Sequence, residues 1–287
     1  MNRSKVIQSV GFAAGVLAAF MCVSAAAATY GGPQSGANPN LRSSAFYIVD
    51  TADSKVLAAR NEQVAAPIAS ITKLMTALVV LDAGQPMDEM ISITREDVRE
   101  TAKSGSRLSQ GVRLSRADLL HLALMSSENR AAHALCRSYS GGVPACVAAM
   151  NAKARSLGMS SAHFVEPTGL SSNNVSSAVD LAKLVQAAAA NATIREYSTD
   201  PEHTFYVRGH AMAFRSTNAL VKKSDWRVTV QKTGYIAEAG RCLVMQTIID
   251  GRDVVIVLLN SWGRLTRIGD ANRVRDWMEA YHPSTSG

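Results

Sequence analysis

The 287-residue sequence has little charge, few aromatic residues and four cysteines. It has no arginine-rich run and no interleaving of aromatic and basic residues, so nucleic acid is not an expected partner. It also has no Gly-x-Ser-x-Gly elbow and no phosphate-binding loop. Its histidines show neither His-Glu-x-x-His spacing nor a Cys-x-x-Cys partner, which argues against a zinc site. We therefore expect no metal and no organic cofactor. The six histidines are His121, His133, His163, His203, His210 and His282.

The start of the chain has the pattern of a secretory signal. Arg3 and Lys5 precede an apolar run, Val10–Val23, and small residues follow at Ser24–Ala28. The run is too short for a membrane-spanning helix and no basic stop follows it. We expect a cleaved signal peptide at residues 1–28, export to the periplasm and no stable membrane anchor. Cleavage lowers the formal charge of +7 by two, and the remaining basicity suits either an anionic cell-wall polymer or simple solubility.

Three cysteines remain after this cleavage. Cys136 and Cys146 are close enough in sequence to pair across the turn at residues 141–144, or they are two free buried thiols. The sequence leaves both alternatives open. Cys242 lies in an apolar run and is expected in the core.

Hydrophobic periodicity predicts strands at both ends of the chain and helices between them. Residues 29–43 are rich in Gly, Pro, Asn and Ser, which predicts a flexible leader. A hairpin is expected over residues 45–50 and 55–59, and a buried helix over residues 70–83. Further helices are expected from Ser115 and over residues 128–138, 144–157, 177–190 and 266–281. Strands are expected from residue 204 onwards, most clearly at 227–236, 241–249 and 254–260, the last two joined by Asp250-Gly251.

This order predicts an α/β (α+β) fold. We expect a mainly antiparallel sheet made from both chain ends and flanked by helices, with an inserted helical lobe at about residues 95–200. The whole domain is expected to span residues 44–283, with its site in the cleft between the lobes.

Three short motifs occur in one order: Ser70–Lys73 (Ser-Ile-Thr-Lys), Ser127–Asn129 (Ser-Glu-Asn) and Lys232–Gly234 (Lys-Thr-Gly). The first two are common by chance, and the third is scarcer. Together they describe an acyl-transfer site in which lysines activate a serine nucleophile.

The first motif provides a nucleophile and a base. Ser70 is expected in the first helical turn, where the helix dipole favours developing negative charge. Lys73 lies three residues on, on the same face, so its amine can reach the Ser70 hydroxyl. An ordinary lysine titrates near 10.4, and lowering its pKa to about 7.5 takes roughly 4 kcal/mol. The apolar helix supplies desolvation, and a cation at Lys232 adds repulsion.

The other two motifs provide proton relay and binding. Ser127 is expected to relay a proton and also to cap a helix, while the Asn129 amide holds a substrate carbonyl. Lys232 and Thr233 suit a substrate carboxylate, on a strand whose open edge can pair with a peptide. Gly234 is expected to let that peptide come close, and the N–H groups of Tyr235 and Ser70 to form an oxyanion hole.

These motifs resemble those of penicillin-binding serine DD-peptidases and serine β-lactamases. The sequence around them, at residues 67–76, 124–132, 164–170 and 232–244, is similar to that of the low-molecular-mass D-alanyl-D-alanine endopeptidases. The resemblance covers about residues 43–280 and implies an acyl-enzyme on Ser70, hydrolysis of D-alanyl–meso-diaminopimelate cross-links in peptidoglycan, and inhibition by β-lactam antibiotics. In this resemblance Ser70, Lys73 and Ser127 are catalytic, and residues 129 and 232–235 bind substrate.

Two differences from related families narrow the expected function to an endopeptidase. The second motif has Glu128 where β-lactamases commonly have Asp, and the chain ends too soon for the extra β-domain and anchor of many DD-carboxypeptidases. Glu166 lacks the Glu-x-x-Leu-Asn setting of a deacylating base, so we expect a structural loop there. The alternatives are a DD-carboxypeptidase, a β-lactamase and a non-catalytic wall-binding module.

Overall fold

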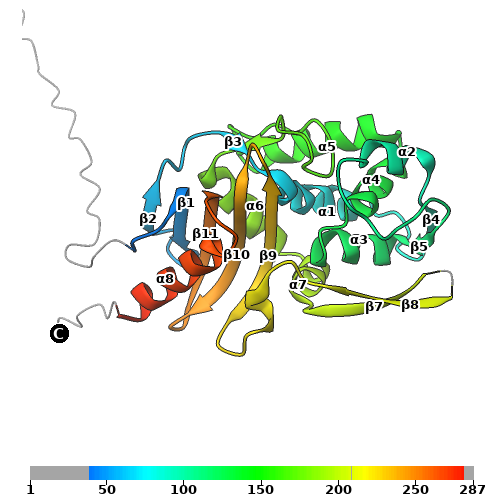
Figure 1. Ribbon diagram of the computed structural model, residues 1–287. Coiled ribbons are helices and arrows are strands. Elements are labelled where there is room, and N and C mark those ends of the chain that lie inside the picture. Colours follow the sequence, from blue (N-terminus) through cyan, green and yellow to red (C-terminus); the bar gives the residue numbers. More distant parts are fainter. Residues whose placement is uncertain (1–38, 208, 281–287) are drawn as a thin grey trace, which may run out of the picture. The chain divides into compact units, whose positions relative to one another are not determined.

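The computed structural model describes residues 39–207 and 209–280 (Figure 1). The expected signal peptide, Cys22 and residues 29–38 of the expected leader lie outside the described residues. The helices are η1 (Ala69–Ile71), α1 (Thr72–Asp82), α2 (Arg95–Glu100), α3 (Arg116–Met125), α4 (Asn129–Arg137), α5 (Gly142–Ser156), α6 (Ala178–Ala189), α7 (Ala192–Thr199), η2 (Ala219–Lys222) and α8 (Thr266–Ala280). The strands are β1 (Ser43–Asp50), β2 (Val56–Arg60), β3 (Ala66–Pro67), β4 (Met90–Ser92), β5 (Arg113–Ser115), β6 (Val175–Ser176), β7 (Glu202–Val207), β8 (His210–Arg215), β9 (Arg227–Ile236), β10 (Gly240–Ile249) and β11 (Arg252–Ser261).

The main sheet joins the two ends of the described chain. Its strand order is β2-β1-β11-β10-β9, and all neighbouring strands are antiparallel. Strand β1 pairs with β11, so that Phe46 lies opposite Leu258. Strand β9 lies at the edge of the sheet, as expected for the strand that carries Lys232. The predicted sheet and its Asp250-Gly251 hairpin are both present.

The two faces of this sheet are buried against different helices. In β11, Val255 and Val257 belong to a core that includes α6, because alternate side chains point to the same face. Ile256 and Leu258, on the other face, pack into a core with Val274 and other residues of α8. Figure 1 shows α8 in front of the sheet and α6 behind it. The nearly continuous apolar sequence of β11 reflects this two-sided burial.

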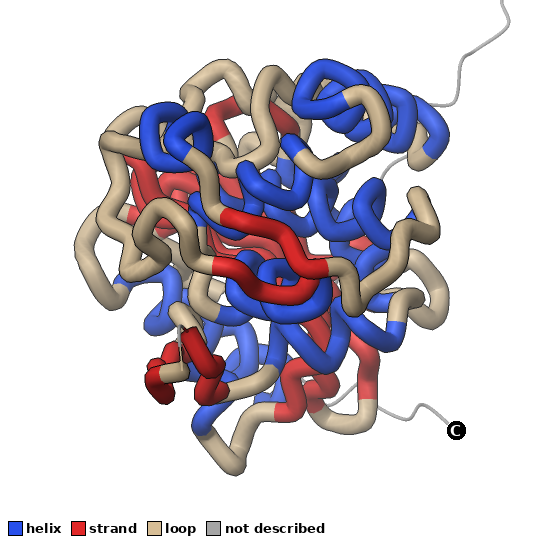
Figure 2. Tube along the Cα trace, turned by 90° about the vertical axis from the view of Figure 1, so that its right-hand side faces the viewer, coloured by secondary structure: helices blue, strands red, loops and turns tan. Residues whose placement is uncertain are grey.

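The helices that precede β9 in the chain surround α1. Residues 72–80 of α1 are all buried, which explains why its sequence is apolar on nearly every side. Helices α3, α4, α5 and α6 all contact it. Figure 2 shows short strands in front of these helices, separate from the main sheet. The sequence analysis missed α2, α7 and the strand pairs β3–β6 and β4–β5, which are too short to show a hydrophobic period.

The packed part of the chain begins before residue 44, the expected boundary of the leader. Leu41 is buried, and the backbone N–H groups of Arg42 and Ser43 donate hydrogen bonds to the carboxylate of Asp270 in α8. Buried Asp270 therefore anchors the start of β1 to the last described helix.

Cys136 in α4 and Cys146 in α5 form a disulfide, the first of the two alternatives that the sequence left open. It links two helices of the helical region. Cys242 is a buried free thiol in β10, as expected for a core residue.

Candidate active site

The backbone around Ser70 is held by two glycines. Ser70 lies in η1, a 3-10 turn that continues directly into α1, rather than in the first turn of the α-helix itself. The residue before it, Ala69, has a left-handed φ of 48°, which is uncommon outside glycine. A Cβ atom at Gly169 would clash with the carbonyl of Ala69, and one at Gly234 would lie 2.9 Å from the carbonyl oxygen of Ile68. Gly234, expected to admit a substrate backbone, therefore admits residues 68–70 of the same chain.

The amine of Lys73 is held beside the Ser70 hydroxyl. Its Nζ lies 2.9 Å from Oγ of Ser70, 2.6 Å from Oδ1 of Asn129 and 2.6 Å from the carbonyl oxygen of Thr168. A neutral amine has two N–H groups and one lone pair. If the N–H groups are donated to Asn129 and Thr168, the lone pair remains for the hydroxyl proton of Ser70. This geometry is that of a general base and its nucleophile.

Burial adjusts the basicity of Lys73. The side chain is only 1% exposed, and this burial lowers its pKa from 10.5 to about 7, whereas the nearby charges of Glu166 and Glu128 raise it. The shift corresponds to about 5 kcal/mol of bias against the charged amine. Burial therefore brings the amine into the range where its neutral form is available near pH 7, as the sequence argument required.

Lys232 is a second buried amine near the first. It is fully buried in β9, and its Nζ donates a hydrogen bond to the carbonyl of Thr233 at 3.1 Å. Burial lowers its pKa well below 10.5, and the positive charges of Lys73 and Arg267 lower it further. Repulsion between the two lysines thus lowers the pKa of Lys232, whereas the lowered pKa of Lys73, which was predicted to depend partly on Lys232, is caused by burial. The third motif thus lies within electrostatic reach of the first, although more than 150 residues separate them in the chain.

Arg267 in α8 is a third basic residue near Lys73 and Lys232, and it was not identified from the sequence. Its Nε and Nη1 atoms are buried and have no hydrogen-bond partner among the described residues. Burial and the charge of Arg241 lower its pKa. Buried guanidinium donors without an acceptor are unfavourable, so this part of the site is suited to receive an anion.

The second motif forms a strained connection between α3 and α4. Ser127 has a left-handed φ of 61°, and Glu128 rather than Ser127 is the N-cap residue of α4. The expectation that Ser127 caps this helix is therefore wrong, because an N-cap residue needs an extended backbone. Among the described residues, the Ser127 hydroxyl has no hydrogen-bond partner. Asn129, two residues later, directly contacts Lys73.

Glu128 is buried beside this connection, and its carboxylate accepts a hydrogen bond from the Ser106 hydroxyl. Burial raises the pKa of Glu128, while this hydrogen bond and the charge of Lys73 act against the rise. Glu128 is therefore an electrostatic neighbour of the Lys73 amine.

The outer part of the third motif is fixed by side chains from other segments. The Thr233 hydroxyl shares a 2.6 Å hydrogen bond with the hydroxyl of Thr217, which follows β8. Tyr235 is exposed, and the guanidinium of Arg241 lies over its ring, 4.5 Å from the centroid. A Cβ at Gly234 would lie 3.3 Å from the amide nitrogen of Ser70, so β9 passes directly beside Ser70.

The loop that contains Glu166 is structural, as expected. Its carboxylate accepts hydrogen bonds from the backbone N–H groups of Thr168 and Gly169, each at 2.6 Å, and from the Asn174 side-chain amide at 2.9 Å. Thr76 of α1 donates to the carbonyl of Pro167 in the same loop. These bonds hold the Thr168 carbonyl against Lys73.

Comparisons with known proteins agree with this arrangement. The D-alanyl-D-alanine carboxypeptidase family of peptidases matches residues 33–263. A D-alanyl-D-alanine endopeptidase of Pseudomonas aeruginosa is 46% identical over 241 residues, covering 83% of this chain and 78% of that protein. One of Escherichia coli is 45% identical, covering 84% and 78%. A solved D-alanyl-D-alanine carboxypeptidase of Mycobacterium tuberculosis superimposes with a TM-score of 0.78 at 27% identity, covering 88% of this chain and 97% of that one.

The chain belongs to this family. It is therefore a serine DD-peptidase, a hydrolase, and both the resemblance seen in the sequence and the predicted fold class are confirmed. Within residues 39–207 and 209–280, no helix combines the length and apolar character needed to cross a membrane.

The other groups that the sequence analysis missed in this peptidase site are the Thr168 carbonyl and the Thr217 hydroxyl. A backbone carbonyl leaves no signal in a sequence. Thr217 is one polar residue among many, and only the folded chain places it beside Thr233.

Proposed function

We propose that this peptidase is an endopeptidase that hydrolyses D-alanyl–meso-diaminopimelate cross-links in peptidoglycan through an acyl-enzyme on Ser70. The observation that carries the proposal is the 2.9 Å contact between the Ser70 hydroxyl and the buried amine of Lys73, whose pKa is lowered to about 7. A buried amine of this basicity beside a serine has no structural need and suits general-base catalysis.

In the first half of the reaction, Lys73 takes the proton of Ser70 while Oγ of Ser70 attacks the carbonyl carbon of the D-alanine in the cross-link. The N–H groups of Ser70 and Tyr235 stabilise the developing oxyanion. The proton then passes from Lys73 through the Ser127 hydroxyl to the departing diaminopimelate nitrogen. The amide C–N bond breaks and leaves an ester on Ser70. The Ser127 hydroxyl, which has no partner among the described residues, is available for this relay.

In the second half, water attacks the ester carbonyl with Lys73 as the base. The proton that Lys73 takes from the water passes to Oγ of Ser70 as the ester C–O bond breaks. This step restores the enzyme and releases a carboxylic acid. A β-lactam antibiotic follows the same first half, because its ring amide presents an equivalent carbonyl. The ester then persists, so we expect β-lactams to be covalent inhibitors.

Substrate recognition uses the cationic side of the site. The carbon next to the departing nitrogen bears a carboxylate, and Lys232, Thr233 and Arg267 offer charge and hydrogen bonds to it. Asn129 is proposed to hold a carbonyl of the donor peptide. Together with Gly234 and Tyr235, these residues bind the peptide along the open edge of β9.

Two observations favour cross-linked peptides over a terminal D-alanine. The relatives at 45% and 46% identity are named endopeptidases, whereas carboxypeptidases appear at 29% and below. A pocket of about 300 Å³ also lies at the end of β9, and its lining includes Tyr235, Arg241, Trp262 and Arg264. Two cations and two exposed aromatic rings suit a second, multiply charged stem peptide.

We further propose that residues 1–28 are a signal peptide that directs a domain of residues 44–283, with its helical lobe at about 95–200, to the periplasm. The cross-linked peptides found there are its expected partners. The proposal includes neither a nucleic-acid partner nor a stable membrane anchor.

The test uses purified protein and two defined substrates, a cross-linked muropeptide dimer and a pentapeptide monomer, with products separated by chromatography and mass spectrometry. We expect monomers from the dimer, and no reaction with the Ser70→Ala variant as the matched control. Abundant free D-alanine from the pentapeptide, with the dimer intact, would identify a carboxypeptidase instead. Rapid turnover of a chromogenic cephalosporin would identify a β-lactamase.

A further inference from the structure

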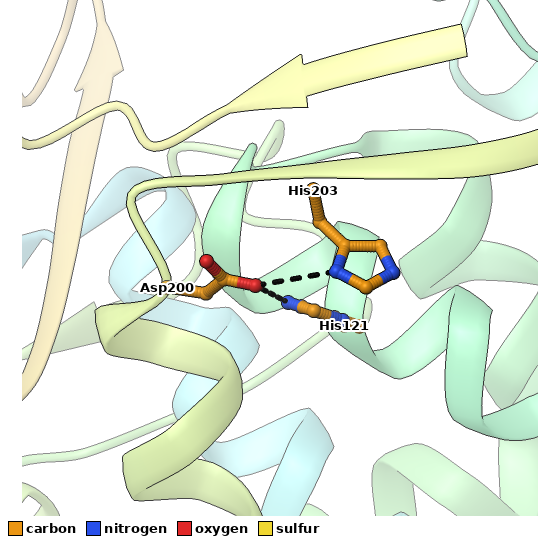
Figure 3. A group of neighbouring side chains, drawn as sticks. All are labelled: His121, Asp200 and His203. Carbon is orange, nitrogen blue, oxygen red and sulfur yellow. Dashed lines mark ion pairs between the residues drawn. The ribbon is translucent and has the colours of Figure 1, made fainter. Parts of the chain in front are cut away.

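A second group of titratable side chains lies apart from the serine centre formed by Ser70, Lys73 and Lys232. His121 of α3, Asp200 after α7 and His203 of β7 point toward one another (Figure 3). Nε2 of His121 lies 3.1 Å from Oδ2 of Asp200, and Nδ1 of His203 lies 3.4 Å from the same oxygen. All three candidate ligand atoms lie within 4.8 Å of one another. The mechanism proposed above uses none of these groups.

The separations match those of a metal-ligand set. Zinc bonds to imidazole nitrogen and carboxylate oxygen are about 2.0–2.2 Å long, so neighbouring ligand atoms in a tetrahedral site lie about 3.3–3.5 Å apart. The two nitrogen–oxygen distances already lie close to this range. The two imidazole nitrogens have further to move, and His203 can supply that movement because its side chain is 46% exposed on β7.

His121 presents a buried nitrogen to the cluster. Its Nε2 atom is buried, and Oδ2 of Asp200 lies 3.1 Å away. In a shared metal site, the lone pairs of both ligands point at the ion. A buried imidazole nitrogen this close to a carboxylate oxygen needs little movement to share an ion with it.

The surroundings hold the ring in place and favour a cation. Tyr197 stacks on the His121 ring with centroids 4.4 Å apart and planes 9° apart, and Phe205 packs against it edge-on at 5.3 Å. Within the described part of the chain, the ion-pair partners of Asp200 are the two imidazoles. The carboxylate of Glu196 also acts on His121 electrostatically.

We propose that His121, Asp200 and His203 bind one divalent transition-metal ion of the zinc class. Two imidazoles and one carboxylate favour zinc over magnesium or calcium, which prefer all-oxygen sites. The three protein ligands leave a fourth position for water on the exposed side. The ion joins α3, the end of α7 and β7, and so fixes the β7–β8 hairpin to the helical region.

This connection ends close to the serine centre. The hairpin continues into Thr217, whose backbone N–H donates to the carbonyl of Met125, the last residue of α3. The Thr217 hydroxyl in turn contacts Thr233. The ion therefore stabilises a segment that supports the substrate-binding strand, without contacting the reacting atoms.

The test is titration of tag-free, chelator-treated protein with zinc chloride, followed by isothermal calorimetry and thermal unfolding. We expect one zinc ion per chain and a rise in Tm. Cobalt(II) in the same site should give the visible absorption of tetrahedral coordination. His203→Ala, at an exposed position that a folded chain tolerates, should weaken zinc binding at least about tenfold.

His210→Ala is the matched control, because His210 is also an exposed histidine, on the paired strand β8 but outside the cluster. It should bind zinc as the unmodified protein does. Penicillin labelling of both variants checks their fold, since neither residue belongs to the serine centre. Absence of zinc binding, or equal binding by the protein and His203→Ala, would overturn the proposal and leave an ion pair only. Neither result bears on the proposed peptidase activity.

Discussion

The helical side of the serine centre, around Lys73, and its strand side, around Lys232, differ in how many hydrogen-bond partners their charged groups have. On the helical side, Lys73 has three hydrogen-bond partners; burial lowers its pKa, and the charges of Glu166 and Glu128 oppose that lowering. On the strand side, Lys232 has one carbonyl partner; burial lowers its pKa, and the charges of Lys73 and Arg267 lower it further. Arg267 adds buried donors that lack acceptors among the described residues.

This difference assigns separate tasks to two lysines that are equally buried. The helical side holds its amine in hydrogen bonds without a ligand, as the proposed proton transfer requires. The strand side has buried donors without acceptors among the described residues, and the proposed substrate carboxylate would supply an acceptor. Variants on each side should therefore fail in different ways.

The largest effect is expected at the nucleophile that both sides serve. Ser70→Ala should abolish covalent labelling by fluorescent penicillin, because Ser70 carries the one hydroxyl that contacts the Lys73 amine within the part of the chain that the structure describes. The hydroxyl contributes little packing, so circular dichroism and Tm should stay close to those of the unmodified protein. Labelling that persists in a folded variant would mean that the nucleophile is another residue.

Removal of the helical-side base should have the next largest effect. Lys73→Ala is expected to slow acylation at least about a hundredfold, the usual loss for a general base. The rate of penicillin acylation, followed by stopped-flow fluorescence, measures this directly. An unchanged rate would show that another group removes the Ser70 proton.

Removal of the strand-side cation should affect binding more than chemistry. Lys232→Ala is expected to lower kcat/KM for a carboxylate-bearing peptide by about ten- to a hundredfold, the range for one lost hydrogen bond to a charged group. The matched control is the same peptide with that carboxylate amidated. Lys232→Ala should cause little further loss with it. An equal loss with both peptides would remove the proposed division between the two sides.

The smallest effect concerns the pKa of Lys73, on the helical side. Acylation depends on the neutral form of Lys73, so its rate should rise about tenfold from pH 6 to pH 8, with a midpoint near the pKa of about 7. Because Glu128 raises that pKa, Glu128→Gln should move the midpoint to lower pH. A rate profile measured for both proteins tests the shift. A midpoint that moves upward would contradict the electrostatic role of Glu128.

The sequence predicted those features that depend on neighbouring residues. The bounds of β9 were predicted to the residue, and the cap at Ser115 and the hairpin at Asp250-Gly251 are present as expected. Ser70 and Lys73 are three residues apart, and the backbone that runs from η1 into α1 brings them together.

The approach of Asn129 and Lys232 to Lys73 was predicted, but other features that depend on distant segments were missed. The Thr168 carbonyl and Arg267 reach the site only through the folding of a loop and of α8. Ser127 was predicted to be a helix cap because its residue type favours that position, but the tertiary structure imposes a left-handed backbone instead. The two histidines of the proposed metal site are 82 positions apart, beyond any local spacing rule.

The pairing of β1 with β11 has a consequence for biosynthesis. The ribosome synthesises the hairpin β1–β2 well before β11, yet a lone two-stranded hairpin is at best marginally stable in water. Its permanent neighbour in the sheet follows only at Arg252–Ser261, and β9, which brings Lys232, precedes that strand at Arg227–Ile236. A nascent polypeptide that has not yet reached these strands therefore lacks Lys232, and its first hairpin lacks the partner that stabilises it.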